Sequence, residues 1–219
     1  MGRVRLLATS GDRLDELRDA YEKSHAEYLQ TTPVMVAGAM KEWMDRTVAG
    51  VPTCARILEV GSGSGRDADY FESLGYRVHR TDVARPFVDR LRAQGKEADF
   101  LDAVRDPFPE EIDVVFANAV VCHFEKPQFS QFLARARAAL QPDGVLSFST
   151  KFGEEYEPTS RQSRLPATRK FSRWPTGELV QFLETHDFVV VWQTVSGGIH
   201  SKSQWINVVA TRRRAIFEI

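Results

Sequence analysis

Cysteine is scarce in this 219-residue chain, and so is any excess of charge of one sign. The two cysteines, Cys54 and Cys122, are too few for a disulfide framework and too isolated for a zinc site. Lysine and arginine number 29 against 30 acidic residues, and this balance excludes a strongly basic overall surface for nucleic acid. Apolar runs of the ~20 residues that span a bilayer are missing, as is a secretory signal. We therefore expect a soluble, cytoplasmic protein with one large core and no metal.

The first fifty residues predict amphipathic helices. Between residues 14 and 28, apolar side chains recur at spacings of three, four and seven positions among charged ones, and residues 36–44 repeat the pattern. A Thr-Thr-Pro sequence at 31–33 separates the two helices, because proline is excluded from a helix interior but suits a helix start. We interpret residues 1–50 as a helical cap that belongs to the same domain as the rest of the chain.

From residue 51 onwards, short apolar runs alternate with helix-period segments. This alternation is typical of a parallel sheet with helices on both faces. The predicted strands are 56–60, 76–81, 97–101, 112–117 and 145–149, and the predicted helices are 67–74, 85–94 and 127–140, the last followed by a turn at 141–144.

The last third of the chain has a different hydropathy pattern. After Gly153 the strand pattern stops, and a polar stretch runs to Arg173 before one more helix. Two β-rich runs, 188–195 and 205–211, close the chain. No helical pattern lies between them, so they should pair antiparallel, since parallel neighbours need a crossover of about a dozen residues. We interpret residues 51–219 as the core of the domain, with a lid-like insertion at 151–174.

The strongest motif is a strand that runs directly into a glycine-rich turn, from Ile57 to Gly65. Glycine permits the sharp turn there and the close approach of a ligand. The helix that begins just after it presents free N–H groups and partial positive charge to a carboxylate or phosphate. Asp82 ends the next strand, 21 residues after Gly61, where an acid can bind ribose hydroxyls. The sequence therefore predicts a nucleoside site.

Two features argue against a dinucleotide in this site. The third glycine of a dinucleotide fingerprint would stand at position 66, which is Arg66, and the glycine falls one place earlier. Glu59, inside the strand end, would disfavour a pyrophosphate and favour a cationic group. A ligand with ribose, adenine and an amino-acid ammonium fits better than NAD. An NAD-type oxidoreductase, for which a Tyr-x-x-x-Lys pair is lacking, and a non-catalytic nucleotide-binding module remain the alternatives.

Taken together and in order, these motifs resemble those of the class I S-adenosylmethionine-dependent methyltransferases. Residues 59–65 followed by Asp82 are similar to the first two family motifs, and 102–109, 112–123 and 140–146 resemble the segments around the third, fourth and fifth strands. The resemblance implies an α/β, Rossmann-like fold with a seven-stranded, mostly parallel sheet, an antiparallel last strand and an N-terminal helical cap. It also implies methyl transfer from S-adenosyl-L-methionine, and the single lid-like insertion in a short chain favours a small-molecule acceptor.

The resemblance implies that the methionine end of this cofactor lies against the glycine loop and the helical cap. Its ammonium would lie near Glu59, unless that side chain only organises the loop. Tyr21 or Tyr28 would close over the carboxylate, with Arg66 as a second anchor. Asn118 would line the methionine and methyl side. The loop residues expected in the cofactor site are Gly61, Gly63 and Gly65.

The adenosine end would be held where the second and third strands finish. Asp82 would accept the ribose hydroxyls, with Val83 against the adenine. Asp102 would accept from the adenine amino group, and the Ala103 backbone would meet the ring. Two other acids within four residues of Asp102 are alternatives for its role.

The acceptor side has one candidate base and one basic segment. His123 follows the fourth strand, where the acceptor should meet the methyl group, and imidazole titrates near neutrality. The alternative is a histidine that bonds the loop backbone or packs against the next helix. Residues 159–176 contain five lysines and arginines and no acid, which predicts either a solvated loop or a lid for a carboxylate or phosphate. The expected acceptor-binding residues are Lys151, Tyr156, Arg169 and Trp174. We expect no nucleic-acid or membrane partner, and the sequence does not predict the oligomeric state.

Overall fold

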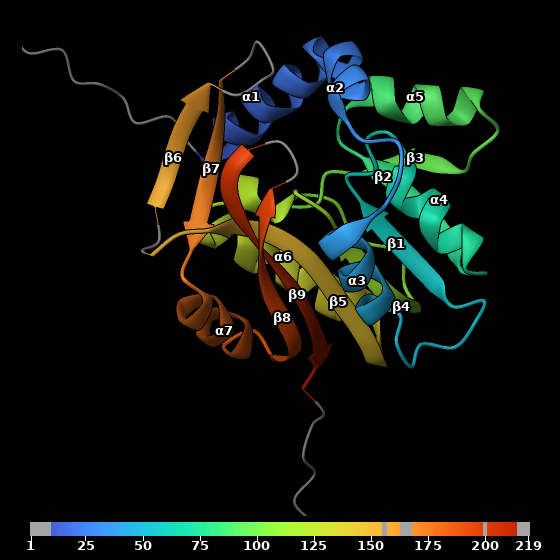
Figure 1. The fold of residues 1–219 in the computed structure, drawn as a ribbon, viewed down its shortest axis with the longest axis vertical. Helices are drawn as coiled ribbons and strands as arrows, with labels where there is room; N and C mark the ends of the chain where they lie inside the picture. The colour runs from blue at the N-terminus through green and yellow to red at the C-terminus, as the bar shows by residue number, and fades with distance from the viewer. Residues whose placement is uncertain (1–9, 155–156, 163–167, 199–200, 214–219) are drawn as a thin grey trace, which may run out of the picture.

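The computed structural model describes residues 10–154, 157–162, 168–198 and 201–213. Figure 1 shows a central sheet with helices packed around it. The helices are α1 (Ser10–Lys23), α2 (His25–Thr31), α3 (Gly38–Thr47), α4 (Arg66–Ser73), α5 (Arg85–Ala93), α6 (Lys126–Ala139) and α7 (Thr176–Glu184), with a 3₁₀ turn η1 at Val121–His123. The strands are β1 (Arg56–Val60), β2 (Arg77–Asp82), β3 (Ala98–Phe100), β4 (Ile112–Ala117), β5 (Leu140–Phe152), β6 (Glu157–Gln162), β7 (Thr168–Trp174), β8 (Phe188–Gly198) and β9 (Ser201–Arg212).

The strands form one mixed sheet. Its order is β3-β2-β1-β4-β5-β7-β6, and β9 lies between β5 and β8. The first five strands are parallel neighbours, whereas β9 runs antiparallel to both β5 and β8. The α/β, mostly parallel sheet with antiparallel C-terminal strands is therefore confirmed, as is the antiparallel pairing of runs 188–195 and 205–211.

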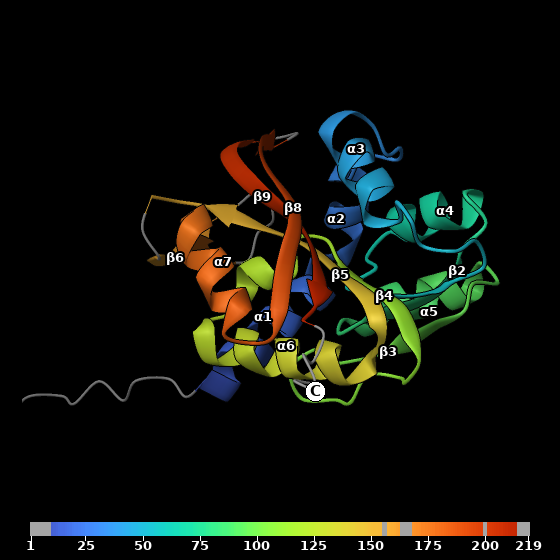
Figure 2. The ribbon, with the colours of Figure 1, turned by 90° about the horizontal axis from the view of Figure 1, so that it is seen from below.

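Two layers of helices cover the sheet, because successive side chains of a strand point to opposite faces. On β4, Val115 and Ala117 pack into a core cluster that α6 and α7 complete. Val114 and Phe116 pack on the other face, with residues of α3 and α4. Figure 2 shows the same division, with α6 on one side of the sheet and α3 and α4 on the other.

The polar stretch after β5 differs from the prediction, because it contains strands. β6 and β7 form an antiparallel hairpin whose register includes Arg161 opposite Arg169. Among the described residues, the hairpin joins the sheet at the end of β5, where Lys151 pairs with Arg173 and Phe152 with Trp174. Along 145–151 the same strand pairs with β9. The hairpin therefore extends the sheet beside the end of β5.

The predicted turn at 141–144 is also different, since these residues belong to β5. Ile112 pairs with Leu140 and Val114 pairs with Val145. An advance of five residues along β5 therefore lies opposite an advance of two residues along β4. A Pro-Asp-Gly sequence thus bulges out of a continuing strand instead of separating a helix from it.

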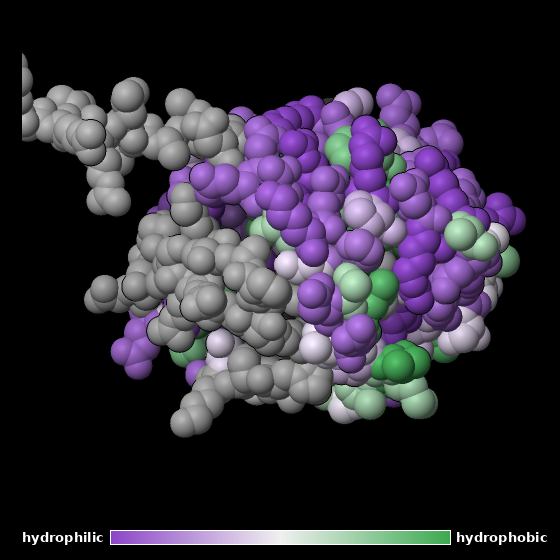
Figure 3. All heavy atoms as spheres, turned by 90° about the horizontal axis from the view of Figure 1, so that it is seen from above, coloured by the Kyte–Doolittle hydropathy of each residue, from purple (hydrophilic) through white to green (hydrophobic). Residues whose placement is uncertain are grey.

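Figure 3 shows the face of the molecule that is at the top of Figure 1. This face is mostly hydrophilic, with small separate hydrophobic groups. In agreement with this view, α2 has no buried residue. Of the described helices, none has the length and apolar character needed to cross a membrane.

Trp43 of α3 anchors the N-terminal helices to the sheet. Its side chain is 1% exposed, stacks on Phe116 at 4.8 Å and donates from Nε1 to Ser147 Oγ at 2.8 Å. We expect Trp43→Ala to lower the free energy of unfolding by about 3–5 kcal/mol, through lost burial and a cavity. Urea unfolding measures this change, with Val34→Ala, at a position 89% exposed, as a control expected within about 0.5 kcal/mol of the wild type. A Trp43→Ala loss below about 1 kcal/mol would mean that α3 is not anchored there.

Candidate functional site

A cavity of about 650 Å³ lies between the ends of the parallel strands and the N-terminal helices. Helices α1 to α3, the loop after β1, the end of β2 and strands β5, β7 and β9 all contribute to its wall. Ligands bind at this position in open α/β sheets. The predicted site residues that line it are Tyr21, Tyr28, Gly61, Gly63, Arg66, Asp82, Val83, Asp102, Ala103, Asn118, His123, Lys151 and Arg169.

Two ends of this cavity differ in charge. We call the part around Gly61, Gly63, Asp82 and Asp102 the loop end, and the part formed by His123 and by residues of β5, β7 and β9 the basic end. The lining carboxylates Asp67, Asp82 and Asp102 come from the first turn of α4 and the ends of β2 and β3, whereas Lys151, Arg169 and Arg173 line the basic end.

The backbone of the glycine loop approaches the cavity closely. Gly61 and Gly63 have positive φ angles of +76° and +50°, which L side chains rarely adopt. A Cβ on Gly61 would lie 2.4 Å from Val120 Cγ2, and a Cβ on Gly63 would lie 3.1 Å from Tyr28 Cε1. Glycine is therefore required at Gly61 by both conformation and space, and Tyr28 covers the loop at Gly63.

Gly65 has a different role from the predicted one. It does not line the cavity and is the left-handed N-cap of α4, with φ +82°. A Cβ there would meet Leu91 Cδ2 of α5 at 2.6 Å. This third glycine allows α4 and α5 to pack closely, and it lies outside the residues that line the cavity.

Glu59 lies beneath the glycine loop and outside the cavity lining. It is 2% exposed, and Oε2 has no hydrogen-bond partner among the described residues. Burial, and then the charge of Asp67, raises the pKa of its carboxyl to about 8, while a hydrogen bond from Ser62 opposes the rise. Since the Glu59 side chain does not line the cavity, it is not positioned to contact a ligand's ammonium. Of the two predicted roles, organising the loop is the one its contacts support.

Asp82 holds the loop and faces the cavity at the same time. Its Oδ2 accepts the Gly63 N–H at 2.9 Å and its Oδ1 accepts the Ala84 N–H at 2.9 Å. Burial raises the pKa of this carboxyl to about 6, although the backbone donors oppose the rise. The side chain is therefore a fixed acceptor at the loop end.

Asp102 is fixed in a similar way at the end of β3. Its Oδ1 accepts the N–H groups of Val104 and Arg105 at 2.9 and 3.0 Å. Its own N–H donates to Asp106 Oδ2 at 2.8 Å. Asp106 therefore braces this turn, while Asp102 lines the cavity with Val83 and Ala103.

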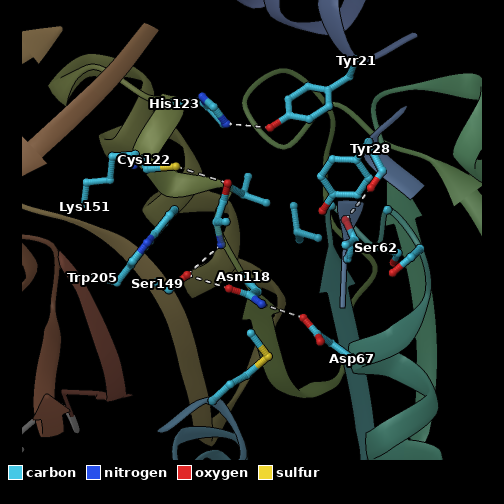
Figure 4. A pocket seen from close by; sticks show the side chains of 18 of the residues that line it. Tyr21, Tyr28, Ser62, Asp67, Asn118, Cys122, His123, Ser149, Lys151 and Trp205 are labelled. Carbon is cyan, nitrogen blue, oxygen red and sulfur yellow. Dashed lines mark hydrogen bonds between the residues drawn. The ribbon is translucent and has the colours of Figure 1, made fainter. Parts of the chain in front are cut away.

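A chain of polar side chains crosses the floor between the two ends (Figure 4). Asn118 donates from Nδ2 to Asp67 Oδ2 at 2.7 Å and accepts at Oδ1 from Ser149 Oγ at 2.8 Å. Arg66 donates from Nε to Asp67 Oδ1 at 2.6 Å. The sequence reasoning missed Asp67 and Ser149; Asp67 could have been found as an acid in the first turn of the helix that follows the glycine loop.

Ala119 carries backbone strain next to this chain. It is a non-glycine residue with φ +59°, and its N–H donates to Ser149 Oγ at 2.7 Å. Its carbonyl accepts from Cys122 Sγ at 3.2 Å. Strained residues of this kind cluster at functional sites. Burial raises the pKa of the Cys122 thiol to about 12, so it is a protonated donor and not a nucleophile.

Aromatic rings surround a lysine at the basic end. Lys151 Nζ lies 4.7 Å from the centroid of the Phe171 ring and 4.6 Å from that of Trp205. Cation–π attraction holds the ammonium in this place. In Figure 4, Lys151 and Trp205 stand across the cavity from Tyr28 and Ser62.

His123 is hydrogen-bonded to Tyr21, as Figure 4 shows. Its Nε2 lies 3.0 Å from Tyr21 Oη, and Arg169 donates from a terminal guanidinium nitrogen to the same oxygen at 2.6 Å. The His123 ring lies 4.8 Å from that of Phe171, with the planes tilted by 36°. The structure thus places Tyr21, predicted together with Tyr28 to cover the glycine-loop ligand, beside the candidate base.

Two of the predicted acceptor-binding residues cannot be assigned to the cavity. Trp174 is fully buried and packs against Phe129 and Phe182, with ring centroids 5.8 and 5.1 Å away. It follows Arg173 on β7, so it points to the opposite face of the strand, and its expected role in the cavity is wrong. Tyr156 lies outside the described residues.

No group of three or more His, Cys, Asp or Glu side chains in the described part of the chain is arranged to hold a metal ion.

Comparison with known proteins gives a family for the central part of the chain. Residues 58–148 match the family model described as a methyltransferase domain. A malonyl-[acyl-carrier protein] O-methyltransferase from Yersinia pestis is 31% identical over 99 residues, which are 43% of this chain and 36% of the relative. That match therefore spans about a third of the relative's length. The matched segment, 58–148, contains the glycine-rich turn and the strand ends on which the predicted resemblance depends.

Solved structures share the fold over almost the whole chain. One is a 1,6-didemethyltoxoflavin-N1-methyltransferase from Burkholderia thailandensis, solved with 1,6-didemethyltoxoflavin and S-adenosylhomocysteine bound. It superposes on this chain with a TM-score of 0.75. It is 21% identical, and the match covers 95% of this chain and 92% of that one. The CcbJ methyltransferase from Streptomyces caelestis is 16% identical over 88% of this chain and 98% of its own, with a TM-score of 0.67. At these identities the likeness concerns the fold.

Proposed function

Because the chain carries a methyltransferase domain of the class I, S-adenosylmethionine-dependent family, we propose that it transfers a methyl group from S-adenosylmethionine to a small-molecule acceptor. The observation that carries this proposal is the arrangement of the glycine loop and Asp82 on one wall of the cavity. The chemistry of the site fits the cofactor, since a fixed carboxylate suits ribose hydroxyls and a positive-φ loop suits close backbone approach.

The residues at the loop end would hold the cofactor. We assign Asp82 to the ribose and Asp102, with Val83 and Ala103, to the adenine. Gly61 and Gly63 would contact the methionine part, which Tyr28 covers because its ring lies over Gly63. Arg66 would anchor the methionine carboxylate, and Asn118 would line the methyl side.

The reaction needs little from the protein beyond alignment. A sulfonium is already an activated methyl donor, so the chain's task is to align the acceptor and exclude water. Burial of His123, which is 4% exposed, and of the floor around Asn118 serves that exclusion. His123 is the proposed base for an acceptor that must lose a proton.

We propose that the acceptor carries a carboxylate or a phosphate. Three cationic side chains line the basic end, whereas the lining carboxylates lie toward the other end. A guanidinium offers five N–H donors in a planar fork, so Arg169 can bind an anion besides Tyr21. The relative's name, malonyl-[acyl-carrier protein] O-methyltransferase, is in keeping with an acidic acceptor. Residues 151–174 would then act as a lid over the acceptor.

The experiment that tests the function has two parts. Titration calorimetry with S-adenosylmethionine, S-adenosylhomocysteine and NAD should give binding of the first two only. Incubation with S-adenosylmethionine and a metabolite panel should then release S-adenosylhomocysteine with at least one acidic compound. Binding of NAD alone would support the oxidoreductase alternative, and binding without methyl transfer to any compound would support a non-catalytic module.

Binding of S-adenosylhomocysteine should strengthen as the pH rises. Burial raises the pKa of Asp82 to about 6, so this carboxyl is mostly protonated at pH 5 and ionised at pH 7. Ribose hydroxyls donate more strongly to the ionised form, and therefore binding gains about tenfold in affinity from pH 5 to pH 7. Calorimetry at both pH values measures this gain, which Asp82→Asn should abolish; an equal gain in that variant would assign the titration to another group.

Lys151→Gln should raise the KM for the acceptor about tenfold, because one charged partner of the anion is removed. Affinity for S-adenosylhomocysteine should stay within about twofold of the wild type. Steady-state kinetics and calorimetry separate the two quantities, with Arg137→Gln on the surface of α6 as a control. A defect in cofactor binding alone would refute the assignment of Lys151 to the acceptor.

A further inference from the structure

We propose that Tyr21 is a catalytic residue, which takes the proton of the methyl acceptor and delivers its own proton to His123. The inference rests on the proposed methyl transfer and adds a step to it. It also gives Tyr21 and Arg169 roles other than those the sequence suggested, which were a cover for the methionine carboxylate and an anchor for the acceptor.

Tyr21, His123 and Arg169, which we call the relay, come from three different elements. Tyr21 comes from α1, His123 from η1 and Arg169 from β7. Tyr21 Oη is 3.0 Å from His123 Nε2 and 2.6 Å from a terminal nitrogen of Arg169. The Tyr21 and His123 rings are nearly perpendicular, at 81°, with centroids 5.7 Å apart. His123 is 4% and Arg169 9% exposed, so the bonds are shielded from solvent.

The chemistry of arginine fixes the direction of the bond between Arg169 and Tyr21. Arginine only donates, so the Tyr21 oxygen must accept from Arg169. Tyr21 has a single hydroxyl proton, and among the described residues the acceptor within reach of it is His123 Nε2. In the proposed relay this bond runs from the Tyr21 hydroxyl to Nε2, which then carries no proton before the reaction.

One acceptor position remains on the Tyr21 oxygen. A hydroxyl oxygen has two lone pairs, and Arg169 uses one. Tyr21 lines the cavity, and the described part of the chain supplies no third partner for its oxygen. His123 Nε2, in contrast, is already used by Tyr21. A ligand N–H or O–H in the cavity would thus meet the tyrosine oxygen before the imidazole.

The proposed step balances in protons and electrons. A lone pair of the acceptor atom forms the bond to the methyl carbon, and the carbon–sulfur bond breaks with its electron pair going to sulfur. The acceptor's proton passes to the Tyr21 oxygen while the Tyr21 proton passes to His123 Nε2. Tyr21 is neutral before and after the step, and His123 becomes an imidazolium that releases its proton later.

Arg169 makes this exchange possible without a free tyrosinate. Burial raises the pKa of Tyr21 well above its ordinary value, so an isolated tyrosinate would not accumulate there. The guanidinium, 5.1 Å from the centroid of the Tyr21 ring, stabilises negative charge on the oxygen while the two protons move. The relay is complete only when β7 and α1 pack together, which ties the chemistry to the β6–β7 hairpin.

Nitrogen NMR of the histidine side chains tests the relay without an acceptor. The protein is labelled with ¹⁵N-histidine and saturated with S-adenosylhomocysteine at pH 7.5. We expect His123 to be neutral with Nε2 unprotonated, and Tyr21→Phe to move that resonance because its hydrogen-bond donor is lost. Tyr28→Phe, which removes the neighbouring hydroxyl, is the control and should leave it in place. A proton on Nε2 in the wild type would overturn the proposal, whatever the acceptor is.

Kinetics tests the same step against a merely structural role. For an acceptor that loses an O–H or N–H proton, Tyr21→Phe should lower kcat about 100-fold or more while affinity for S-adenosylhomocysteine changes less than about threefold. With 4-nitrothiophenolate, which has no proton to lose, the same variant should keep the wild-type rate within about threefold. Equal slowing of both acceptors, or of neither, would contradict the relay and leave the methyltransferase assignment standing.

Discussion

Asp82→Ala is expected to weaken binding of S-adenosylmethionine at least tenfold, on the scale of about 1.5–3 kcal/mol for hydrogen bonds to a charged group. The carboxylate accepts the N–H groups of Gly63 and Ala84, so the substitution removes the proposed ribose partner and also frees two backbone donors that shape the loop. Both effects act on the same ligand. Titration calorimetry on the purified variant measures the change.

Asp99→Ala is the matched control for this experiment. Asp99 lies on the adjacent strand β3, is exposed, and pairs with Arg92 and His79 outside the cavity. Its removal should leave cofactor affinity within about twofold, since surface substitutions rarely matter. Unchanged affinity in Asp82→Ala, or an equal loss in both variants, would refute the assignment of Asp82 to the ribose.

Gly61→Ala should have the second large effect, a loss of cofactor affinity of 100-fold or more together with lower stability. At φ +76° an alanine is strained by about 1–2 kcal/mol. Its Cβ would also lie 2.4 Å from Val120 Cγ2, so that the loop or the segment after Asn118 must shift. Such overpacking costs about 1–3 kcal/mol more. Because the shift falls on two walls of the cofactor site, binding suffers more than folding does.

Gly75→Ala separates the two causes. Gly75 has φ +92°, and a Cβ there would have nothing within 4 Å. It therefore carries the backbone strain without the collision, and its variant should lose stability but keep cofactor affinity. Adding Val120→Ala to Gly61→Ala should recover part of the lost affinity. If Gly61→Ala keeps the same cofactor affinity as Gly75→Ala, the close approach of the Gly61 backbone to Val120 has no part in cofactor binding.

The loop end of the site could be predicted because it depends on local rules. A strand followed by glycines and a helix start restricts the backbone to a few conformations, and an acid at the next strand end must lie beside it in a parallel sheet. Gly61, Gly63 and Asp82 therefore line the cavity as expected. The packing of Gly65 against Leu91 could not be predicted, because Leu91 belongs to the next helix along the chain.

The β6–β7 hairpin could not be read from hydropathy. On β7, Arg169, Phe171 and Arg173 alternate along one face and all line the cavity. Arginine scores as polar although its aliphatic stem is buried, so the period of two is hidden. The same alternation sends Trp174 into the core, which hydropathy alone would not distinguish from a cavity position.

The contact between Tyr21 and His123 depends on tertiary packing. The two residues are 102 positions apart, and helical spacing predicts only that Tyr21 is on the apolar face of α1. Which tyrosine covers the glycine loop and which meets the histidine is decided by where α1 and α2 cross the sheet. In the structure, Tyr28 covers the glycine loop and Tyr21 contacts the histidine.

A crystal structure of the protein soaked with S-adenosylhomocysteine tests the central claim most directly. We predict the ribose hydroxyls on Asp82, the amino-acid part over Gly61 and Gly63, and the sulfur directed toward the basic end. An empty cavity at saturating ligand, or a dinucleotide pyrophosphate against the glycine loop in a parallel soak with NAD, would contradict it.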